Sequence, residues 1–534
     1  MSFYAAPSRI TRKASPSLLL TNLLAGPSAV SRNEHSSPSG DHRLMAKSSL
    51  EITRMRISAR AIATVLFIAA CSISSMAQSA PASPDKLWHS KAEESFSHEL
   101  TTASSSKYTI DPTKTYTLAD LIDLAEEHNP ETRLAWQNAK ARAASLGIAR
   151  SALYPTMAAV AVANTSRIRI LFNSDFIRQT IGVFQPDLQV DYLIFDFGAR
   201  SGAIEAAKAN LLGADFAFND THRTIIFQVT TAYYQLLNQM GQEAAANASL
   251  QNARAVQEDA EDRLTNGLAT KPDVLEATAA TAQAEYDSQA VVGAEEIARG
   301  NLATLLQLPP ETHIQVQDIN DLSPPKDLME PEDQAVARAF QQRPDLKEQI
   351  TRLHAATAEI KQARSAYFPT LGFSGDGGTV RQYGQQELLT PAYNSGEVWN
   401  VSLQLKWTLF DGGRREHQIA QAKAETSAAQ ANIDSLQDEI ANEVWTAYSN
   451  VKTAQRQRQA AMALLASADQ SYAAALESYK DGVRNLLDVV SSQKALAQAR
   501  SEDIYTRTQL LTQLATFAFR TGDLIQTGPK KVNP

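Results

Sequence analysis

The sequence predicts a mixed α/β membrane protein made of two similar halves, each with one β-hairpin and one long helical hairpin. Three segments recur at offsets of 214, 215 and 215 residues. Ala149–Thr156 recurs as Ala363–Thr370, Leu193–Gly198 recurs as Thr408–Gly413, and Asn266–Val274 recurs as Asp481–Val489. A nearly constant offset of this length indicates a duplicated domain rather than a short-period solenoid.

The composition limits the class of protein. The 534 residues include 50 Lys and Arg against 58 Asp and Glu, so no basic surface favours nucleic acid as a partner. The single cysteine, Cys71, excludes a disulfide framework. After the leader, no apolar run is long enough for a transmembrane helix.

The N-terminal region predicts export from the cytoplasm. Arg54, Arg56 and Arg60 precede the apolar run 61–70, which has the length of a secretion signal. Three alternatives remain open: cleavage after Ala77, lipid attachment to Cys71 within a lipobox-like sequence, or an uncleaved anchor. We therefore assign residues 1–77 to an extension and signal peptide, and 78–116, rich in Ser, Thr and Pro, to a linker.

The two halves open with matching helices. Thr117 caps a short helix that Asn129-Pro130 breaks, and a second helix runs from about Glu131 to Leu153. In the other half, Pro331-Glu332 starts a short helix and Arg343-Pro344 breaks it. The predicted boundaries are 117–310 for the first repeat, 311–331 for an irregular connector, 332–522 for the second repeat and 523–534 for a tail.

Each half then contains an alternating apolar and polar stretch, which predicts a β-strand. The clearest are Leu188–Ile194 and Val401–Leu409, with weaker partners at Ala158–Ile168 and Leu371–Val380. We expect strands of about ten residues, the length that crosses a bilayer when tilted, joined by loops of roughly 20 residues. On the last strand the side chains of Val401, Leu403, Leu405, Trp407 and Leu409 should face lipid, and those of Ser402, Gln404, Lys406 and Thr408 the opposite side. Trp407, Tyr192, Tyr154 and Phe368 lie near the strand ends, where aromatic residues mark a membrane interface.

Long helices follow the strands. Residues 414–481 contain neither Pro nor Gly and show apolar residues at steps of three and four, as in a coiled coil. Residues 219–239 show the same stripe. Each long helix reaches a glycine, Gly267 or Gly482, and return helices are predicted at Val274–Leu308 and from Val489 to about Phe519.

This doubled order of elements and motifs resembles the TolC-type outer-membrane efflux proteins, also called outer membrane factors, over about residues 117–522. The resemblance implies a homotrimer in which four strands per chain close a 12-stranded transmembrane β-barrel in outer-membrane lipid. It also implies that the long helical hairpins form a periplasmic α-barrel. A passive channel-tunnel for efflux or secretion, type I secretion included, follows from this likeness. Its partners would be a periplasmic adaptor protein and an inner-membrane pump.

The resemblance also assigns functional positions at the periplasmic tip. The adaptor-contact turns would be Asn266-Gly267-Leu268 and Asp481-Gly482-Val483. Asp273, Tyr479 and Arg484 match positions that hold the closed tube, through an Arg–carboxylate hydrogen bond with a tyrosine alongside. Asp488 matches an aspartate that lines the pore constriction and favours cations, although Ser491 replaces the second acidic residue common in the family.

No residue pattern favours an enzyme or a cofactor. The chain contains no Walker loop, no Gly-x-Ser-x-Gly and no metal-spaced His or Cys cluster. His354 and His417 are most simply solvated or packed residues. The alternative function is a periplasmic coiled-coil adaptor of an efflux system, which also carries helical hairpins. Trimers that resist heat in detergent would favour the channel, and extraction without detergent would favour the adaptor.

Overall fold

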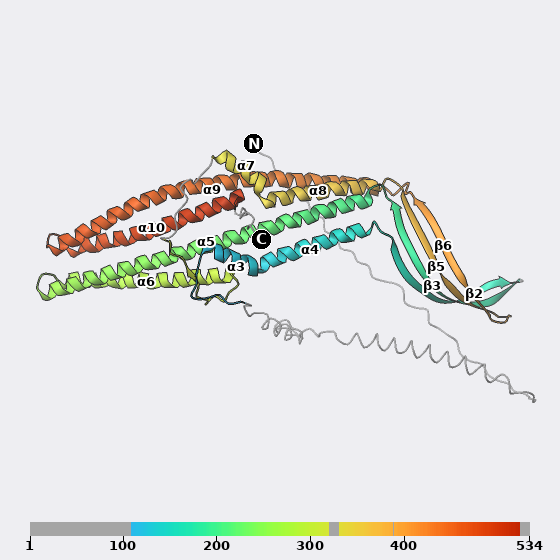
Figure 1. Cartoon of the computed structure of the whole chain (residues 1–534), viewed down its shortest axis with the longest axis horizontal. Coiled ribbons are helices and arrows are strands. Elements are labelled where there is room, and N and C mark those ends of the chain that lie inside the picture. Colours follow the sequence, from blue (N-terminus) through green and yellow to red (C-terminus); the bar gives the residue numbers. More distant parts are fainter. Residues whose placement is uncertain (1–107, 173, 320–330, 388, 524–534) are drawn as a thin grey trace, which may run out of the picture. The chain divides into compact units, whose positions relative to one another are not determined.

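The computed structural model describes residues 108–172, 174–319, 331–387 and 389–523 (Figure 1). The chain divides into a unit of residues Met1–Ser104 and a unit of residues Ser105–Pro534, and all described residues belong to the second. The predicted signal peptide, Cys71 and most of the linker lie outside the described residues.

The first half begins with a short strand and two helices, followed by a β-hairpin and a long helical hairpin. The elements are β1 (Thr115–Tyr116), α3 (Leu118–His128), α4 (Pro130–Ser151), β2 (Thr156–Phe172), β3 (Asp175–Phe195), α5 (Ala199–Thr265) and α6 (Lys271–Leu305). The predicted helix starts are confirmed, because Thr117 forms a capping box with Asp120 and Asn129 caps α4 just before Pro130.

The second half repeats this order. After the short strand β4 (Gln315–Val316), which pairs in parallel with β1, come α7 (Glu332–Gln342), α8 (Pro344–Ser365), β5 (Thr370–Gln386), β6 (Ala392–Lys406), α9 (Arg414–Lys480) and α10 (Leu486–Thr521). The helices α5 and α9 have 67 residues each, a length of about 100 Å at 1.5 Å per residue. The long helices and their return helices are therefore confirmed.

The duplication extends to the packing. One core joins α3, α5 and α6, and the other joins α7, α9 and α10. Ile225, Val229 and Leu302 of the first core match Ile440, Val444 and Phe517 of the second, each 215 residues further along the chain. A third cluster near the tip, which includes Val256, Tyr479 and Val489, packs the two helical hairpins together.

The four long strands form one antiparallel sheet in the order β2-β3-β5-β6. They have 17, 21, 17 and 15 residues, so the prediction of ten-residue strands is wrong. The predicted loops of roughly 20 residues are wrong for the same reason: these segments continue the strands. Only residues 173–174 separate β2 from β3, and 387–391 separate β5 from β6.

A proline explains part of this error. Pro186 lies inside β3, a central strand, where proline is normally avoided because it cannot donate a ladder hydrogen bond. The neighbouring β5 carries Gly378 at this point, and a Cβ there would lie 2.1 Å from the Pro186 carbonyl oxygen. Glycine thus lets the two strands approach where the ladder is interrupted.

Each strand continues a helix, and the two layers keep one order. The helices α4, α5, α8 and α9 pack side by side in that order, and they connect to β2, β3, β5 and β6 respectively (Figure 1). The chain therefore forms one wall four elements wide, which is built of helices at one end and of strands at the other.

A repeated Asp–Arg pair builds the junction between sheet and helices. The Nε of Arg200 donates to the Asp196 carboxylate at 3.0 Å, and its terminal nitrogens donate to the carbonyls of Ala152 and Ile194, both at 3.0 Å. In the second half, Arg415 forms an ion pair with Asp411 at 2.9 Å and donates to the carbonyls of Thr408 and Leu409 at 2.8 and 3.1 Å. Among the described residues, these carbonyl groups at the junction have no partner in a strand or a helix. Each arginine binds such groups and thereby connects them to the first turn of the following helix.

The junction generates a prediction. Arg200→Met leaves a mostly buried carboxylate and two carbonyls without their charged donor, so it should lower the free energy of unfolding by about 1.5–3 kcal/mol. Arg200→Lys should recover only part of this, because one ammonium group cannot reproduce the planar donor array. The measurement is the temperature at which the detergent-extracted protein unfolds. Arg133→Met, at an exposed position of α4, is the matched control and should change nothing.

Candidate functional site

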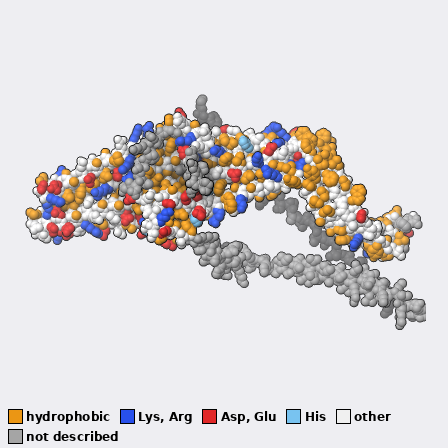
Figure 2. All heavy atoms as spheres, in the orientation of Figure 1, with side chains coloured by type: hydrophobic (Ala, Val, Ile, Leu, Met, Phe, Trp, Pro, Cys, Tyr) orange, Lys and Arg blue, Asp and Glu red, His pale blue; other side chains and the backbone are white. Residues whose placement is uncertain are grey.

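The register of the sheet assigns every strand residue to one of two faces, because directly paired residues share a face. One face is apolar through the half of the sheet nearest the helices. Its side chains there include Met157, Phe184, Leu188, Val190, Tyr192, Phe373, Trp399, Val401, Leu403 and Leu405. Most of them are exposed in the single chain, and Figure 2 shows hydrophobic side chains gathered over this part of the sheet.

The opposite face is mainly polar over the same rows of β3, β5 and β6, whereas β2 contributes Ala158, Val160 and Val162 to it. Gln185, Asp187, Gln189 and Asp191 alternate along β3. Ser374 and Ser402 hydrogen bond at 2.8 Å between β5 and β6, and Asn400 donates to Asp376 at 3.2 Å. Because one face is apolar and the other polar, the sheet has the two-sided pattern of a barrel wall with lipid outside and water inside.

The predicted lipid-facing set of β6 is consistent with this pattern. Val401, Leu403 and Leu405 lie on the apolar face, and Ser402, Gln404 and Lys406 on the other. Trp407, Thr408 and Leu409 follow the last residue of β6. Trp407 donates its indole N–H to the Tyr367 carbonyl at 3.1 Å.

Aromatic residues mark both ends of the apolar face. Tyr154, Phe368 and Trp407 lie at the end nearest the helices. The ring of Phe368 there stacks on that of Phe197, with centroids 5.0 Å apart. Towards the other end, the rings of Tyr383 and Tyr393 also lie 5.0 Å apart. Such paired belts are typical of the two interfaces of a membrane.

The two helix–helix turns at the far end of the hairpins have the same geometry. Gly267 and Gly482 adopt positive φ angles of 70° and 72°, and the following N–H groups of Leu268 and Val483 donate to the carbonyls of Arg263 and Ser478 at 2.7 and 2.8 Å. This is the Schellman arrangement that ends a helix at a left-handed glycine. Both turns expose an aliphatic side chain, since Leu268 is 75% and Val483 is 79% accessible.

The residues assigned to the gate surround these turns, and the structure brings two of them together. Tyr479 of α9 is buried in the tip cluster, and its hydroxyl has no hydrogen-bond partner among the described residues. Burial raises the pKa of Tyr479, and the nearby carboxylates of Asp259 and Asp273 add to this effect while Arg263 opposes it. Val274, the residue after Asp273, packs against the same cluster, so the start of α6 lies beside Tyr479 although the two belong to different hairpins.

The arginine beside Tyr479 is Arg263, which the sequence analysis missed. Its guanidinium carbon lies 4.3 Å from the centre of the Tyr479 ring, and it donates to the Lys480 carbonyl at 2.7 Å. It also pairs with Asp259, one helical turn back, at 3.2 Å. Arg263 thus links the end of α5 to the end of α9 across the two hairpins.

The remaining gate residues have other surroundings in the single chain. Asp273 completes the capping box of α6, where its carboxylate accepts from the N–H and hydroxyl of Thr270 at 2.8 and 2.6 Å. These bonds hold its pKa below the usual range. Within the part of the chain that the structure describes, the Arg484 guanidinium group and the Asp488 carboxylate make no hydrogen bond or ion pair. The Arg484–carboxylate bond implied by the resemblance is therefore not formed inside one protomer.

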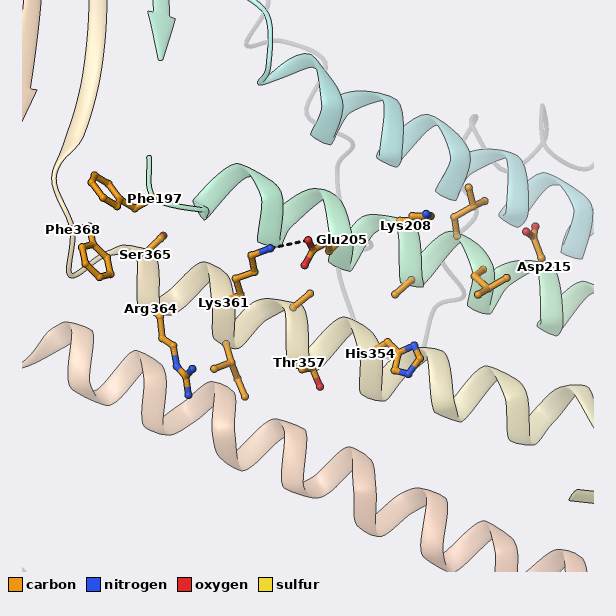
Figure 3. Close-up of a pocket in the computed structure, with 15 residues that line it drawn as sticks. Phe197, Glu205, Lys208, Asp215, His354, Thr357, Lys361, Arg364, Ser365 and Phe368 are labelled. Carbon is orange, nitrogen blue, oxygen red and sulfur yellow. Dashed lines mark hydrogen bonds and ion pairs between the residues drawn. The ribbon is translucent and has the colours of Figure 1, made fainter. Parts of the chain in front are cut away.

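A groove of about 930 Å³ runs between α5 and α8 beneath the sheet (Figure 3). Lys361 of α8 pairs with Glu205 of α5 at 2.7 Å across it, and His354 lies at its far end. The Ser365 hydroxyl donates to the Gln362 carbonyl of its own helix. The Lys361–Glu205 pair therefore links the two helices across the groove.

The described ranges lack two other kinds of feature. Among these residues, no helix combines the length and apolar character required to cross a bilayer. The same residues contain no group of three or more His, Cys, Asp or Glu side chains placed to hold a metal ion.

Comparisons with known proteins agree with these surfaces. The family model described as outer membrane efflux protein matches residues 121–307 and 335–523. The chain is 29% identical to Protein CyaE of Bordetella pertussis over 76% of this chain and 84% of that protein. It is 23% identical to the outer membrane protein TolC of Escherichia coli over 72% and 78% of the two chains. The crystal structure of the outer membrane protein VceC from Vibrio cholerae superposes with a TM-score of 0.63 at 20% identity, covering 76% of this chain and 96% of that one.

The chain belongs to the outer membrane efflux protein family. It is a channel-tunnel of the bacterial outer membrane for efflux or secretion, with its helices in the periplasm. The alternative of a periplasmic adaptor is not favoured, because the match includes both strand pairs as well as the helical hairpins.

The two faces of the sheet generate a prediction. Val401→Arg places a charge in the middle of the apolar face and should cost roughly 2–4 kcal/mol of stability in the membrane. Ser402→Arg, one residue along on the polar face, should cost little. Folding into lipid vesicles at increasing denaturant concentrations measures both. Equal loss in the two variants would contradict the assignment of lipid to one face.

Proposed function

We propose that three copies of this chain close a 12-stranded barrel and a continuous helical tunnel. In the described part of the chain, β2 and β6 are the edges of the sheet, and each has a strand partner on one side only. Backbone groups at such edges cannot remain unpaired in hydrocarbon, so β2 of one copy must pair with β6 of the next. The proposal rests on this observation, that both edge strands, β2 and β6, lack a second strand partner.

The helices support the same closure. Because α4 and α9 lie at the two ends of the helical row, the ring that pairs β2 with β6 also places α4 beside the α9 of the neighbouring copy. Both helices expose large apolar side chains in the single chain, among them Trp136 and Ile148 on α4 and Trp445 on α9. These side chains gain a partner when the ring closes.

The tip is the proposed gate. In the closed tube, Arg263 holds the two hairpins of each chain together through the Tyr479 ring and the Lys480 carbonyl. The Arg484 guanidinium group, with no partner inside the described protomer, is free to reach a neighbouring copy, and three Asp488 carboxylates gather around the axis. A ring of like charges at a constriction attracts cations.

The channel itself supplies no energy in this proposal. The exposed aliphatic residues Leu268 and Val483 receive the helical tips of a periplasmic adaptor, which connects the tunnel to an inner-membrane pump. Docking strains the tip contacts, and cargo then leaves the cell without entering the periplasm.

The assembly and the gate can be tested on purified protein. In detergent the particle should contain three chains by mass, and in a planar bilayer it should show a small closed-state conductance. Arg263→Ala removes a charged hydrogen bond worth about 1.5–3 kcal/mol, so opening should become at least about tenfold more frequent. Arg484→Ala should also raise the closed-state conductance, and Asp488→Asn should lower cation selectivity.

A matched control lies on the same helix. Arg254→Ala removes an arginine that pairs with Glu285 at 3.6 Å within its own hairpin, so it should leave conductance unchanged. A one-chain mass would refute the trimer. A silent Arg263→Ala would remove this residue from the gate while leaving the tunnel intact.

The adaptor turns can be tested in cells. Nothing lies within 4 Å of a Cβ placed on Gly267 or Gly482, so a large side chain there points outward and obstructs a docking partner. The paired change to Phe at both glycines should abolish export and leave the trimer assembled. Asn at both positions tolerates the left-handed backbone and should retain most export. Loss of the trimer in the Phe variant would instead mean that these glycines serve only the turn.

A further inference from the structure

Three arginines lie at the end of the sheet farthest from the helices, on the same face as the apolar side chains. Arg167 pairs with Thr180, and Arg169 pairs directly with Arg178 across β2 and β3. The register places these residues on the face of Phe184 and Leu188. All three arginines are exposed.

These arginines lie just beyond the apolar part of the face. From Ile194 to Phe184 the apolar face runs for ten residues of β3, about 25 Å along the membrane normal for a strand tilted by roughly 40°. The row of Gly182, Tyr383 and Tyr393 follows, and the arginines come in the next rows. Since the helices lie on the periplasmic side, this end of the sheet meets the outer leaflet.

The positive charge here is only partly balanced within the chain. Two arginines directly opposite each other on one face repel, which destabilises a strand pair unless an anion lies between them. Arg178 forms an ion pair with Glu387 at 2.8 Å, and Arg167 donates to the Thr180 hydroxyl at 3.0 Å. The hydrogen bonds from Arg178 lower the pKa of Glu387, and the positive charge of Arg169 lowers it further.

The other charged groups on this face leave an excess of cations. Arg381 of β5 and Glu397 of β6 lie on it two and three rows closer to the helices than Arg167, whereas Asp175 of β3 lies on the opposite face. Among the described residues of this face on the far side of Leu188 from the helices, there are therefore four arginines and two carboxylates. The arginines are Arg167, Arg169, Arg178 and Arg381, and the carboxylates are those of Glu387 and Glu397. Arginine binds phosphate through two parallel hydrogen bonds, and its long stem can follow the apolar surface while its head meets the lipid headgroups.

We propose that Arg167, Arg169 and Arg178 form a binding site for the phosphorylated headgroup of an outer-leaflet lipid. The acyl chains of this lipid lie along the apolar face below, and its phosphate bridges the opposed Arg169 and Arg178. The proposal goes beyond the channel function, because it assigns a lipid-specific contact to the outside of the barrel wall.

The test measures lipid bound by the purified protein. Bisphosphorylated lipid A and its dephosphorylated form are added in detergent with EDTA, so that no divalent cation bridges the phosphates, and the bound lipid is counted by native mass spectrometry. The wild type should prefer the phosphorylated lipid. Arg169→Gln together with Arg178→Gln should weaken that preference roughly tenfold or more.

Two further variants keep the test decisive. Arg150→Gln with Arg414→Gln removes the same charge from exposed positions at the other end of the sheet and should leave binding unchanged. Glu387→Gln frees Arg178 from its carboxylate and should strengthen binding of the phosphorylated lipid, which gives a readout even if the double arginine variant folds poorly.

The outcome is independent of the channel proposal. Oligomeric mass is read in the same spectra, so a failure to form trimers is distinguished from a failure to bind lipid. Equal binding of the two lipids by the wild type would overturn the proposed site, as would an unchanged preference in the double arginine variant.

Discussion

The Asp–Arg junction between strands and helices is the contact on which the arrangement of the chain depends. Carbonyl groups are left free wherever a strand ends and a helix has not yet begun, and buried free carbonyls are costly. Arg200 and Arg415 satisfy these groups in both halves, each held in position by the aspartate four residues earlier. Because β3 and β6 are tied in this way to α5 and α9, the order of the sheet carries over into the order of the helical wall.

That common order makes the two ends of the protein interdependent. Strands lie about 4.8 Å apart in a sheet, whereas packed helices lie about 8–10 Å apart. A wall of four strands is therefore narrower than a wall of four helices. The chain meets this mismatch at the junctions, where Phe197 just before α5 stacks on Phe368 just after α8 and leaves the groove between these helices open.

The sequence was sufficient to predict the repeat, the helix starts and the alternating faces, because each has a local signal. Thr117 and Asn129-Pro130 are capping patterns, and 401–406 alternates strictly. The strand lengths were missed because Pro186 and the glycines of β5, such as Gly375 and Gly378, resemble loop residues. Neighbouring strands overrode these propensities through the hydrogen-bond ladder.

The tip was harder to predict, because its contacts join residues far apart in the chain. Arg263 and Tyr479 are separated by more than 200 positions, and no local pattern connects them. The junction arginines did leave a signal: an arginine follows the aspartate by four residues in both halves, at 196–200 and 411–415. A position-by-position comparison of the two repeats would have revealed this pair, which the sequence analysis missed.

The unpaired edges of the sheet have a genetic consequence. In the proposed ring of three, every chain supplies one edge to each neighbour, so a defective chain spoils the two interfaces it enters. A cell that makes equal amounts of sound and defective chains assembles only about one ring in eight free of the defect, if mixing is random. Mutations at the edges of β2 or β6 should therefore behave as dominant, whereas mutations that prevent a chain from reaching the membrane should be recessive.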